Sequence, residues 1–280
     1  ASSSRGLGDV YKRQRWNPPA KSAATSDSRA TPDMRIPRIY TAAGIEANGD
    51  IELEPGPSRH LSKVLRLKIG DSLVLFNGSG GQYPARITAI DRKSVRASVG
   101  DFEPVELESE LCLQLGIAIS RGERMDWVVQ KATELGVSSI APLLSERTEV
   151  RLDPERADKK LRHWQQIAIS ACEQCGRNRP PRIMPLKGLE HWLQEVDAQV
   201  RLVLHPSAGN SAPGLSPPAS VALLVGPEGG FSEEEIVKAE KAGFRSLQLG
   251  PRVLRTETAP LAAIAILQAR WGDMATHDAR

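Results

Sequence analysis

The sequence predicts an α/β protein in which a small β-barrel precedes a domain with a parallel sheet. From Met34 to Phe102, short segments with alternating apolar residues are separated by turn residues, a pattern typical of small barrels. Beyond the Glu-rich linker at 103–110, apolar strand segments alternate with segments of helical periodicity, which indicates a parallel sheet. No apolar run approaches the ~20 residues that span a bilayer. We therefore expect a soluble, cytoplasmic protein.

Composition predicts how the chain divides into segments, and it shows that the net charge is not evenly distributed along the chain. Residues 1–33 lack apolar periodicity, so we expect disorder there and interpret them as a non-native leader; a transit peptide is the alternative. They hold six basic and three acidic residues, which leaves 31 of each in the remainder, so nucleic-acid binding has to be argued from local patches. The expected segments are the leader (1–33), the barrel (34–104), the parallel-sheet domain (105–275) and a tail (276–280).

The first domain should contain a glycine-rich hairpin and one helix among its strands. Asn77–Gly81 leads into alternating strand sequence, so it predicts a hairpin loop and not a dinucleotide site. The expected strands are Arg38–Tyr40, Asp50–Leu53, Asp71–Phe76, Tyr83–Ile90 and Ser94–Val99.

The helix expected over Ser58–Lys68 has an apolar and a basic side. Leu61, Val64, Leu65 and Leu67 should face the barrel. The outward residues are Arg59, Lys63, Arg66 and Lys68, with no acidic residue among them. This face is either simply solvated or contacts RNA phosphates, and we favour RNA.

The second domain alternates strands with helices. The expected strands are Leu111–Ile119, Ser139–Leu143, Val200–Leu204, Val221–Val225 and Ser246–Leu249. The expected helices are Arg124–Leu135, Pro154–Gln174, Leu189–Glu195, Ser232–Ala242 and Pro260–Trp271, and a loop covers His205–Ser220. The last helix is apolar nearly all round, which suggests a subunit interface.

A glycine turn, Gly226–Gly230, joins one of these strands to a well-specified helix start. Ser232 and Glu235 have the spacing of a capping box, flanked by Phe231 and Ile236 at hydrophobic-staple positions. The glutamates at 233–235 already occupy the field of the helix N-terminus, which normally attracts anions. We therefore expect a neutral or cationic ligand at this turn.

The three cysteines fit a reducing compartment, because an odd count of this size makes no disulfide framework. Cys172 and Cys175 fall at the end of a predicted helix, where the dipole disfavours a thiolate. Cys112 cannot complete a four-cysteine metal site. We interpret all three as structural and expect no metal.

Candidate ligand loops follow the carboxyl ends of three strands. No nucleophile elbow, P-loop, dinucleotide fingerprint or zinc-protease motif occurs in the sequence. Open parallel sheets bind ligands at the carboxyl ends of their strands. We therefore expect one pocket from Leu204–Pro206, Gly226–Gly230 and Leu249–Ala259.

Six motifs occur in order along the chain: Met34–Tyr40, His60–Arg66, Lys131–Val137, Ala171–Arg179, Leu224–Gly230 and Leu249–Thr258. Together they resemble the RsmE family of small-subunit (16S-type) ribosomal RNA uridine-N3 methyltransferases, in the SPOUT superfamily. The resemblance implies a PUA-like barrel, a trefoil-knotted methyltransferase domain, S-adenosylmethionine (SAM) as donor and ribosomal RNA as substrate. The pattern alone would give an unknotted sheet. With the apolar last helix, we expect a homodimer.

The resemblance also implies site residues. The implied cofactor-binding residues are Leu204, His205, Gly226, Pro227, Glu228, Gly229, Gly230, Leu249, Gly250, Leu254 and Thr256. For RNA, we expect contacts from Arg38, Arg59, His60, Lys63, Arg66, Arg121, Arg177 and Arg179. For Arg177 and Arg179, a charge complementing a helix dipole is the alternative.

Catalysis at uridine N3 requires loss of a weakly acidic proton. A cation near the uracil carbonyl oxygens would stabilise the developing anion, and we assign this role to Arg255 and proton acceptance to Glu257. The alternative for this pair is a structural ion pair. Alternative functions are methylation of another RNA, such as tRNA, and a non-catalytic RNA-binding module in ribosome assembly.

Overall fold

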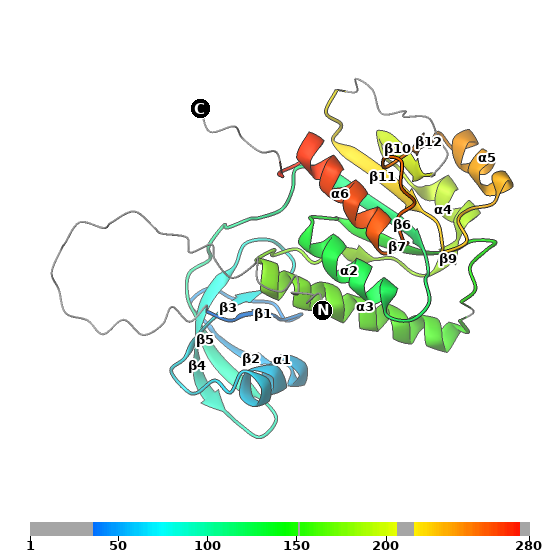
Figure 1. Ribbon diagram of the computed structural model, residues 1–280. Helices are drawn as coiled ribbons and strands as arrows, with labels where there is room; N and C mark the ends of the chain where they lie inside the picture. Colours follow the sequence, from blue (N-terminus) through cyan, green and yellow to red (C-terminus); the bar gives the residue numbers. More distant parts are fainter. Residues whose placement is uncertain (1–35, 151, 206–215, 275–280) are drawn as a thin grey trace, which may run out of the picture. The chain divides into compact units, whose positions relative to one another are not determined.

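A computed structural model describes residues 36–150, 152–205 and 216–274, so the leader, Met34, most of the loop before Ser220 and the tail lie outside the described residues. The first sheet has the strand order β1-β3-β4-β5-β2 (Figure 1). Its strands are β1 (Arg38–Tyr40), β2 (Asp50–Leu53), β3 (Ser72–Phe76), β4 (Tyr83–Ile90) and β5 (Val95–Val99). β1 and β3 are parallel, and the other pairs are antiparallel. All five expected strands are confirmed within one residue.

The core of this sheet follows from strand alternation. Leu73 and Leu75 of β3 are buried while Ser72 is exposed, because successive side chains point to opposite faces. The loop between β3 and β4 is a hairpin connection, as predicted, since these strands pair antiparallel on either side of it. Gly80 and Gly81 in this loop have positive φ; a Cβ at Gly80 would clash with the side chains of Arg179 and Glu106, and one at Gly81 would clash with the Phe102 ring.

The helix of this domain differs from the prediction in its start and its burial. It begins at Pro55 as α1 (Pro55–Arg59) and continues as a π-helical segment, η2 (His60–Val64). Leu61 is fully buried, but Val64 is 64% exposed and Leu65 38% exposed, so two of the expected barrel contacts were wrong. The hydrogen bond from Leu65 N to His60 O, 2.9 Å, closes a wider turn, which rotates the later residues away from α-helical spacing.

The second sheet is entirely parallel, with the order β12-β10-β11-β6-β7-β8, and β9 also pairs with β7. Its strands are β6 (Cys112–Ala118), β7 (Ser139–Leu144), β8 (Arg182–Ile183), β9 (Lys187–Gly188), β10 (Val200–Leu204), β11 (Ser220–Val225) and β12 (Arg245–Leu247). The two-residue strands β8 and β9 were not predicted, because they are too short to show periodicity. β12 ends at Leu247, before the predicted Leu249.

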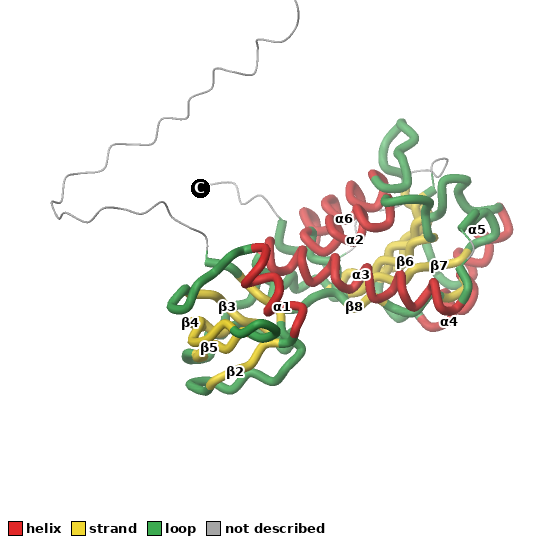
Figure 2. The backbone as a smooth tube through the Cα atoms, turned by 90° about the horizontal axis from the view of Figure 1, so that it is seen from below, coloured by secondary structure: helices red, strands yellow, loops and turns green. Residues whose placement is uncertain are grey.

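Helices cover both faces of this sheet. The helices are α2 (Arg124–Glu134), α3 (Pro154–Cys175), α4 (Leu189–Glu195), α5 (Glu233–Lys241) and α6 (Thr258–Trp271). Leu223 of β11 joins a core cluster with α2, α3 and α6, whereas its neighbour Leu224 joins one with α4 and α5. Figure 2 shows α2, α3 and α6 lying together. Within the described residues, no helix is long and apolar enough to cross a membrane.

The strand order reverses between β6 and β11. β6 pairs with β7, its successor in sequence, on one side and with the distant β11 on the other. The loops that leave the carboxyl ends of these neighbouring strands meet at one edge of the sheet. Such a switch point is where open parallel sheets form a ligand crevice.

Candidate functional site

The glycine turn after β11 brings bare backbone to this edge. Gly230 N donates to Pro227 O at 2.9 Å, which closes the turn. A Cβ on Gly226 would lie 3.2 Å from the Phe231 ring and 3.3 Å from the carbonyl carbon of Gly230. A side chain at Gly226 would therefore require the Phe231 ring or the backbone at Gly230 to shift slightly, whereas glycine avoids this crowding, and the turn leaves Glu228–Gly230 exposed.

The helix start behind the turn is the predicted capping box. Ser232 N donates to Glu235 Oε2 at 3.0 Å, and Glu235 N donates to Ser232 Oγ at 3.3 Å. Glu235 has a further partner that the sequence did not indicate, since its Oε1 accepts from Glu146 N at 2.8 Å. One buried carboxylate therefore fixes both α5 and the loop after β7.

A cleft of about 650 Å³ opens beside this turn. The loops after β10, β11 and β12 form it, as the sequence predicted. Its lining includes every residue expected to bind the cofactor, namely Leu204, His205, Gly226, Pro227, Glu228, Gly229, Gly230, Leu249, Gly250, Leu254 and Thr256. Its volume falls in the range of small-molecule sites. The structure thus brings together residues far apart in sequence into one space.

Arg255 and Glu257 also line this cleft, but they do not pair with each other. Glu257 Oε2 lies 3.7 Å from Nε of Arg124. Within the described residues, no ion pair or hydrogen bond involves the Arg255 side chain; its carbonyl accepts from the N–H groups of Thr258 and Ala259, each at 2.9 Å. Among the described residues Arg255 and Glu257 thus form no ion pair with each other, but Glu257, at the start of α6, pairs with Arg124, so the structural alternative stands for Glu257.

Arg124 is a site residue that sequence reasoning missed. It lies at the start of α2, and its Nη1 also binds Glu228 Oε1, so it joins α2 to the glycine turn and to α6. Burial raises the pKa of Glu228, but hydrogen bonds from its own backbone N–H, from Arg121 N and from Arg124 outweigh burial, and the net pKa is lowered. The sequence did contain a signal for Arg124, because this basic residue begins the predicted helix that follows the first strand of the parallel sheet.

A second space, a wide and open depression of about 810 Å³ that we call the second cavity, adjoins the cleft. Arg121 lines it, as a predicted substrate contact, and forms an ion pair with Glu149 at 2.7 Å. Trp127 lines it as well and was not predicted to have a role. The two spaces share Arg124, Glu228 and Glu257.

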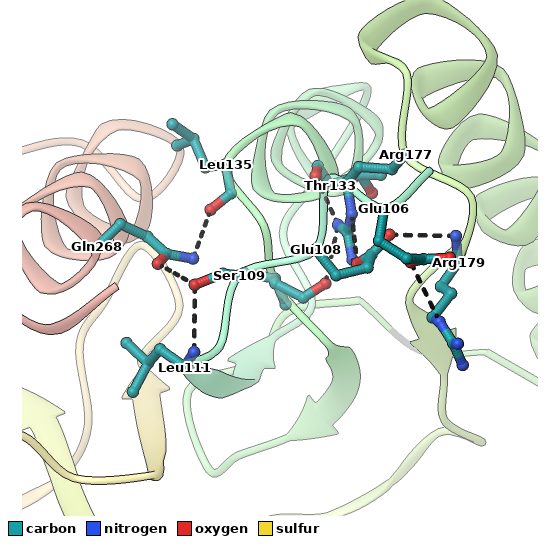
Figure 3. A network of polar contacts seen from close by, with 10 residues as sticks. Glu106, Glu108, Ser109, Leu111, Thr133, Leu135, Arg177, Arg179 and Gln268 are labelled. Atoms are coloured by element: carbon teal, nitrogen blue, oxygen red, sulfur yellow. Dashed lines mark hydrogen bonds and ion pairs between the residues drawn. The ribbon is translucent and has the colours of Figure 1, made fainter. Parts of the chain in front are cut away.

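Arg177 does not lie at this edge. It is 4% exposed, and its guanidinium binds Glu108 Oε2 at 2.6 Å and the carbonyl oxygens of Thr133 and Val137 at 2.7 and 3.1 Å (Figure 3). We correct the expectation of an RNA contact, because these partners and its burial leave the side chain no access to a ligand. Thr133 is in the last turn of α2, so Arg177 complements the dipole of α2, not that of the preceding α3.

The residues beside Arg177 join the linker and the barrel. Arg179 is half exposed and pairs with Glu106 at 3.3 Å (Figure 3). Asn178 is fully buried; its amide donates to Val105 O at 2.6 Å and its oxygen accepts from Arg38. Arg38 also binds Gln82 and lies 5.1 Å from the centre of the Phe76 ring. Arg38 is therefore engaged in contacts within the protein.

The basic residues of α1, of η2 and of the turn that follows η2 remain exposed. Arg59, His60, Lys63 and Arg66 are all on the surface, and none lines the cleft or the second cavity. Arg66 has a positive φ of 55°, which ends the helical segment. This surface remains a predicted RNA contact.

The pKa of Cys175 differs from what the helix dipole predicts. A hydrogen bond from the Cys172 thiol lowers the pKa of Cys175 to about 6, with help from the backbone N–H and the charge of Arg177. This favours a thiolate at Cys175, contrary to the argument from the helix dipole. The described residues contain no group of three or more His, Cys, Asp or Glu side chains placed to hold a metal.

Two family models match the chain. An RNA methyltransferase domain matches residues 107–268, and an RNA methyltransferase PUA domain matches residues 58–100. Ribosomal RNA small subunit methyltransferase E of Buchnera aphidicola is 38% identical over 86% of this chain and 98% of its own. The Bacillus subtilis protein of that name is 30% identical over 74% of this chain and 85% of its own.

Solved structures agree with this match. Ribosomal RNA small subunit methyltransferase E from Neisseria gonorrhoeae, bound to S-adenosyl methionine, superposes with a TM-score of 0.82 at 41% identity, over 85% of this chain and 99% of that one. A Legionella pneumophila protein solved with SAM gives 0.83 at 42%, over 86% and 100%. The barrel and the all-parallel methyltransferase domain agree with the two-domain fold that the resemblance implied. The chain belongs to the family of ribosomal RNA small subunit methyltransferases E.

Proposed function

We propose that this protein transfers a methyl group from SAM to N3 of a uridine in 16S-type ribosomal RNA. The coarser assignment, a SAM-dependent ribosomal RNA methyltransferase, follows from family membership and from the SAM bound in the Neisseria gonorrhoeae relative. The uridine and the atom N3 are the finer proposal. We further assign the barrel to residues 34–104 and the catalytic domain to 105–275.

One observation carries the proposal: the cleft gathers every residue expected to bind the cofactor. The chemistry of the cleft fits SAM for two reasons. The glycine turn allows a ligand to approach the backbone closely. The acidic first turn of α5, Glu233–Glu235, disfavours a phosphate. Leu204, Leu249 and Leu254 supply apolar contacts for a nucleoside. SAM supplies an electrophilic methyl group on a positively charged sulfur.

The side chains beside the cleft can assist attack by a uracil nitrogen. We assign acceptance of the N3 proton to Glu257, which lines the cleft and lies 3.7 Å from Nε of Arg124. Arg255 has no competing ion pair within the described residues, so its guanidinium is available to the carbonyl oxygens of the developing uracil anion. Positioning of the base supplies the remainder of the rate enhancement.

RNA binding and dimerisation complete the proposal. The exposed basic residues Arg59, His60, Lys63 and Arg66 would contact phosphates of the rRNA outside the cleft. Most residues of α6 are apolar, and its Ile266 is 52% exposed. This exposed apolar side chain favours burial of α6 against a second copy of the chain.

The decisive experiment supplies methyl-labelled SAM with unmodified small ribosomal subunits and, separately, with naked rRNA. Label in one uridine, with the methyl group at N3 by mass spectrometry of nucleosides, is the expected result. Label at another position or in tRNA would refute the finer proposal while preserving methyl transfer. SAM binding by calorimetry without methylation of any RNA would indicate a non-catalytic module.

A further inference from the structure

The second cavity lies directly against the cofactor cleft and has a different lining. It is formed by Arg121, Gly122, Glu123, Arg124, Trp127, Glu149, Glu228 and Glu257, and has a volume of about 810 Å³. Of the residues expected to bind the cofactor, only Glu228 lines it. Arg124 and Glu257 border both spaces, so a ligand here would meet one in the cleft across these side chains.

The cavity belongs to the same edge of the sheet as the cleft. Arg121 follows β6, Glu149 follows β7, and Glu228 follows β11. The Arg121–Glu149 pair and the Arg124–Glu228 pair fix two of its walls. The cavity is therefore built at the switch point of the sheet, where a substrate is expected to bind.

Trp127 is the feature of this cavity that most needs explanation. The opposite side of α2 is buried in the core through Met125, Val128 and Val129, yet Trp127 is 51% exposed. Nζ of Lys131 lies 5.3 Å from the centre of its ring, and Lys131 is held by Glu134 at 2.8 Å. A large ring kept at a cavity wall offers a flat surface on which a base can stack.

The charges of the lining favour a base over a phosphate. Two arginines face four glutamates, and both arginines are already paired with glutamates. A phosphate here would therefore meet surplus negative charge. A neutral uracil has no such conflict, and its N3–H can donate to a carboxylate.

Resting on the proposed function, we infer that this cavity receives the target uracil, which stacks on Trp127 and presents N3 at the junction between Arg124 and Glu257. Trp127 is then a substrate-positioning residue that fixes the plane of the base. The base has to leave its stack in the RNA to enter, and stacking on Trp127 offsets part of that cost.

The test compares Trp127→Ala with Trp127→Phe and with Val237→Ala, an exposed apolar residue of α5 that lines neither space. Single-turnover methylation of small-subunit rRNA is measured against substrate concentration. We expect Trp127→Ala to lower kcat/KM about tenfold or more, and Trp127→Phe to retain most of it, because any aromatic ring can stack. Val237→Ala should match the wild type.

Two further measurements separate stacking from a structural role. SAM affinity by calorimetry should be unchanged in Trp127→Ala, because Trp127 does not line the cleft. The oligomeric state by light scattering should also be unchanged. Loss of SAM affinity or of oligomeric state would identify Trp127 as a structural or subunit contact and overturn the inference.

The wild-type reaction distinguishes this inference from the function on which it rests. If the wild type methylates a uridine and Trp127→Ala retains full kcat/KM, only the stacking role fails. If the wild type methylates no uridine, the proposed function fails and the inference fails with it. Transcripts containing 5-bromouridine should in addition photo-cross-link to the α2 peptide that contains Trp127.

Discussion

The glycine turn after β11 and the segment Gly176–Arg179 after α3 are both conspicuous in the sequence, but the structure uses them differently. Gly226–Gly230 opens onto a cleft and has bare backbone facing it. Arg177 and Asn178 are buried and point into the protein, where they meet linker and helix groups. The comparison teaches that a motif of charged residues can be architecture, while a motif with few side chains can be the site.

The contacts that an arginine makes within the protein decide whether it has a structural role or is free to bind a ligand. Arg177 satisfies its donors with a carboxylate and two carbonyl oxygens, so nothing is left for a ligand. Arg255 makes no such contacts with described residues and borders the cleft. The following substitutions test this division.

The largest expected effect is loss of stability in Arg177→Ala. Removing the guanidinium takes the charged partner from the carboxylate of Glu108 and one donor from each of two buried carbonyl oxygens, which should cost about 3 kcal/mol or more of unfolding free energy. Urea denaturation measures this. Arg179→Ala is the matched control, because its ion pair with Glu106 is exposed and should be worth less than about 1 kcal/mol. Equal losses in the two variants would contradict a structural role specific to Arg177.

Arg255→Ala should be the complementary case, with loss of rate and no loss of stability. We expect kcat to fall about 100-fold, because one group that stabilises the developing anion is removed. SAM affinity and the urea midpoint should remain at wild-type values. Arg245→Ala, an exposed residue of β12 outside the cleft, is the control. A wild-type rate in folded, SAM-binding Arg255→Ala would remove Arg255 from the mechanism.

Gly226→Ala should weaken SAM binding about tenfold, because the added methyl group forces the Phe231 ring or the turn to move. Calorimetry measures the dissociation constant. Gly188→Ala has open space around its Cβ and should bind SAM normally. If both variants bind alike, the turn does not need glycine at this position for ligand access.

The smallest expected effect is on the pH at which the thiol of Cys175 becomes reactive toward alkylation. Because the thiol of Cys172 and Arg177 lower its pKa to about 6, alkylation by iodoacetamide should rise through pH 6 and not near the usual value of 9.0. The measurement uses Cys112→Ser, since Cys112 is exposed. In the same background, Arg177→Ala should move the midpoint to higher pH, because the positive charge that stabilises the thiolate is gone. An unchanged midpoint would show that Arg177 has no part in it.

Elements with strong local patterns could be predicted from the sequence. Strand alternation located β1 to β5, and helical periodicity located α2 and α3. The capping box at Ser232 was also predictable, because all of its atoms come from four consecutive residues. Alternating strands and helices indicated a parallel sheet, but only the resemblance to a family supplied the knot.

Contacts between distant segments could not be predicted. The partners of Arg177 are Glu108, Thr133 and Val137, on the linker and at the end of α2, and nothing local to Arg177 indicates them. The same holds for the link from Arg124 to Glu228 and Glu257. The π-helical turn after His60 shifted burial away from Val64 because its hydrogen bond departs from regular spacing.

The pairing of β6 with β11 has a consequence for biosynthesis. Leu113 emerges early and must find Val221, which is made only after β7, α3 and β10. Contacts so distant in sequence form slowly, and until then the apolar edge of β6 lies open. The cleft itself is built from the last third of the chain. A nascent chain that ends before β11 therefore has all five strands of the barrel, an unprotected edge on β6 and no cofactor site.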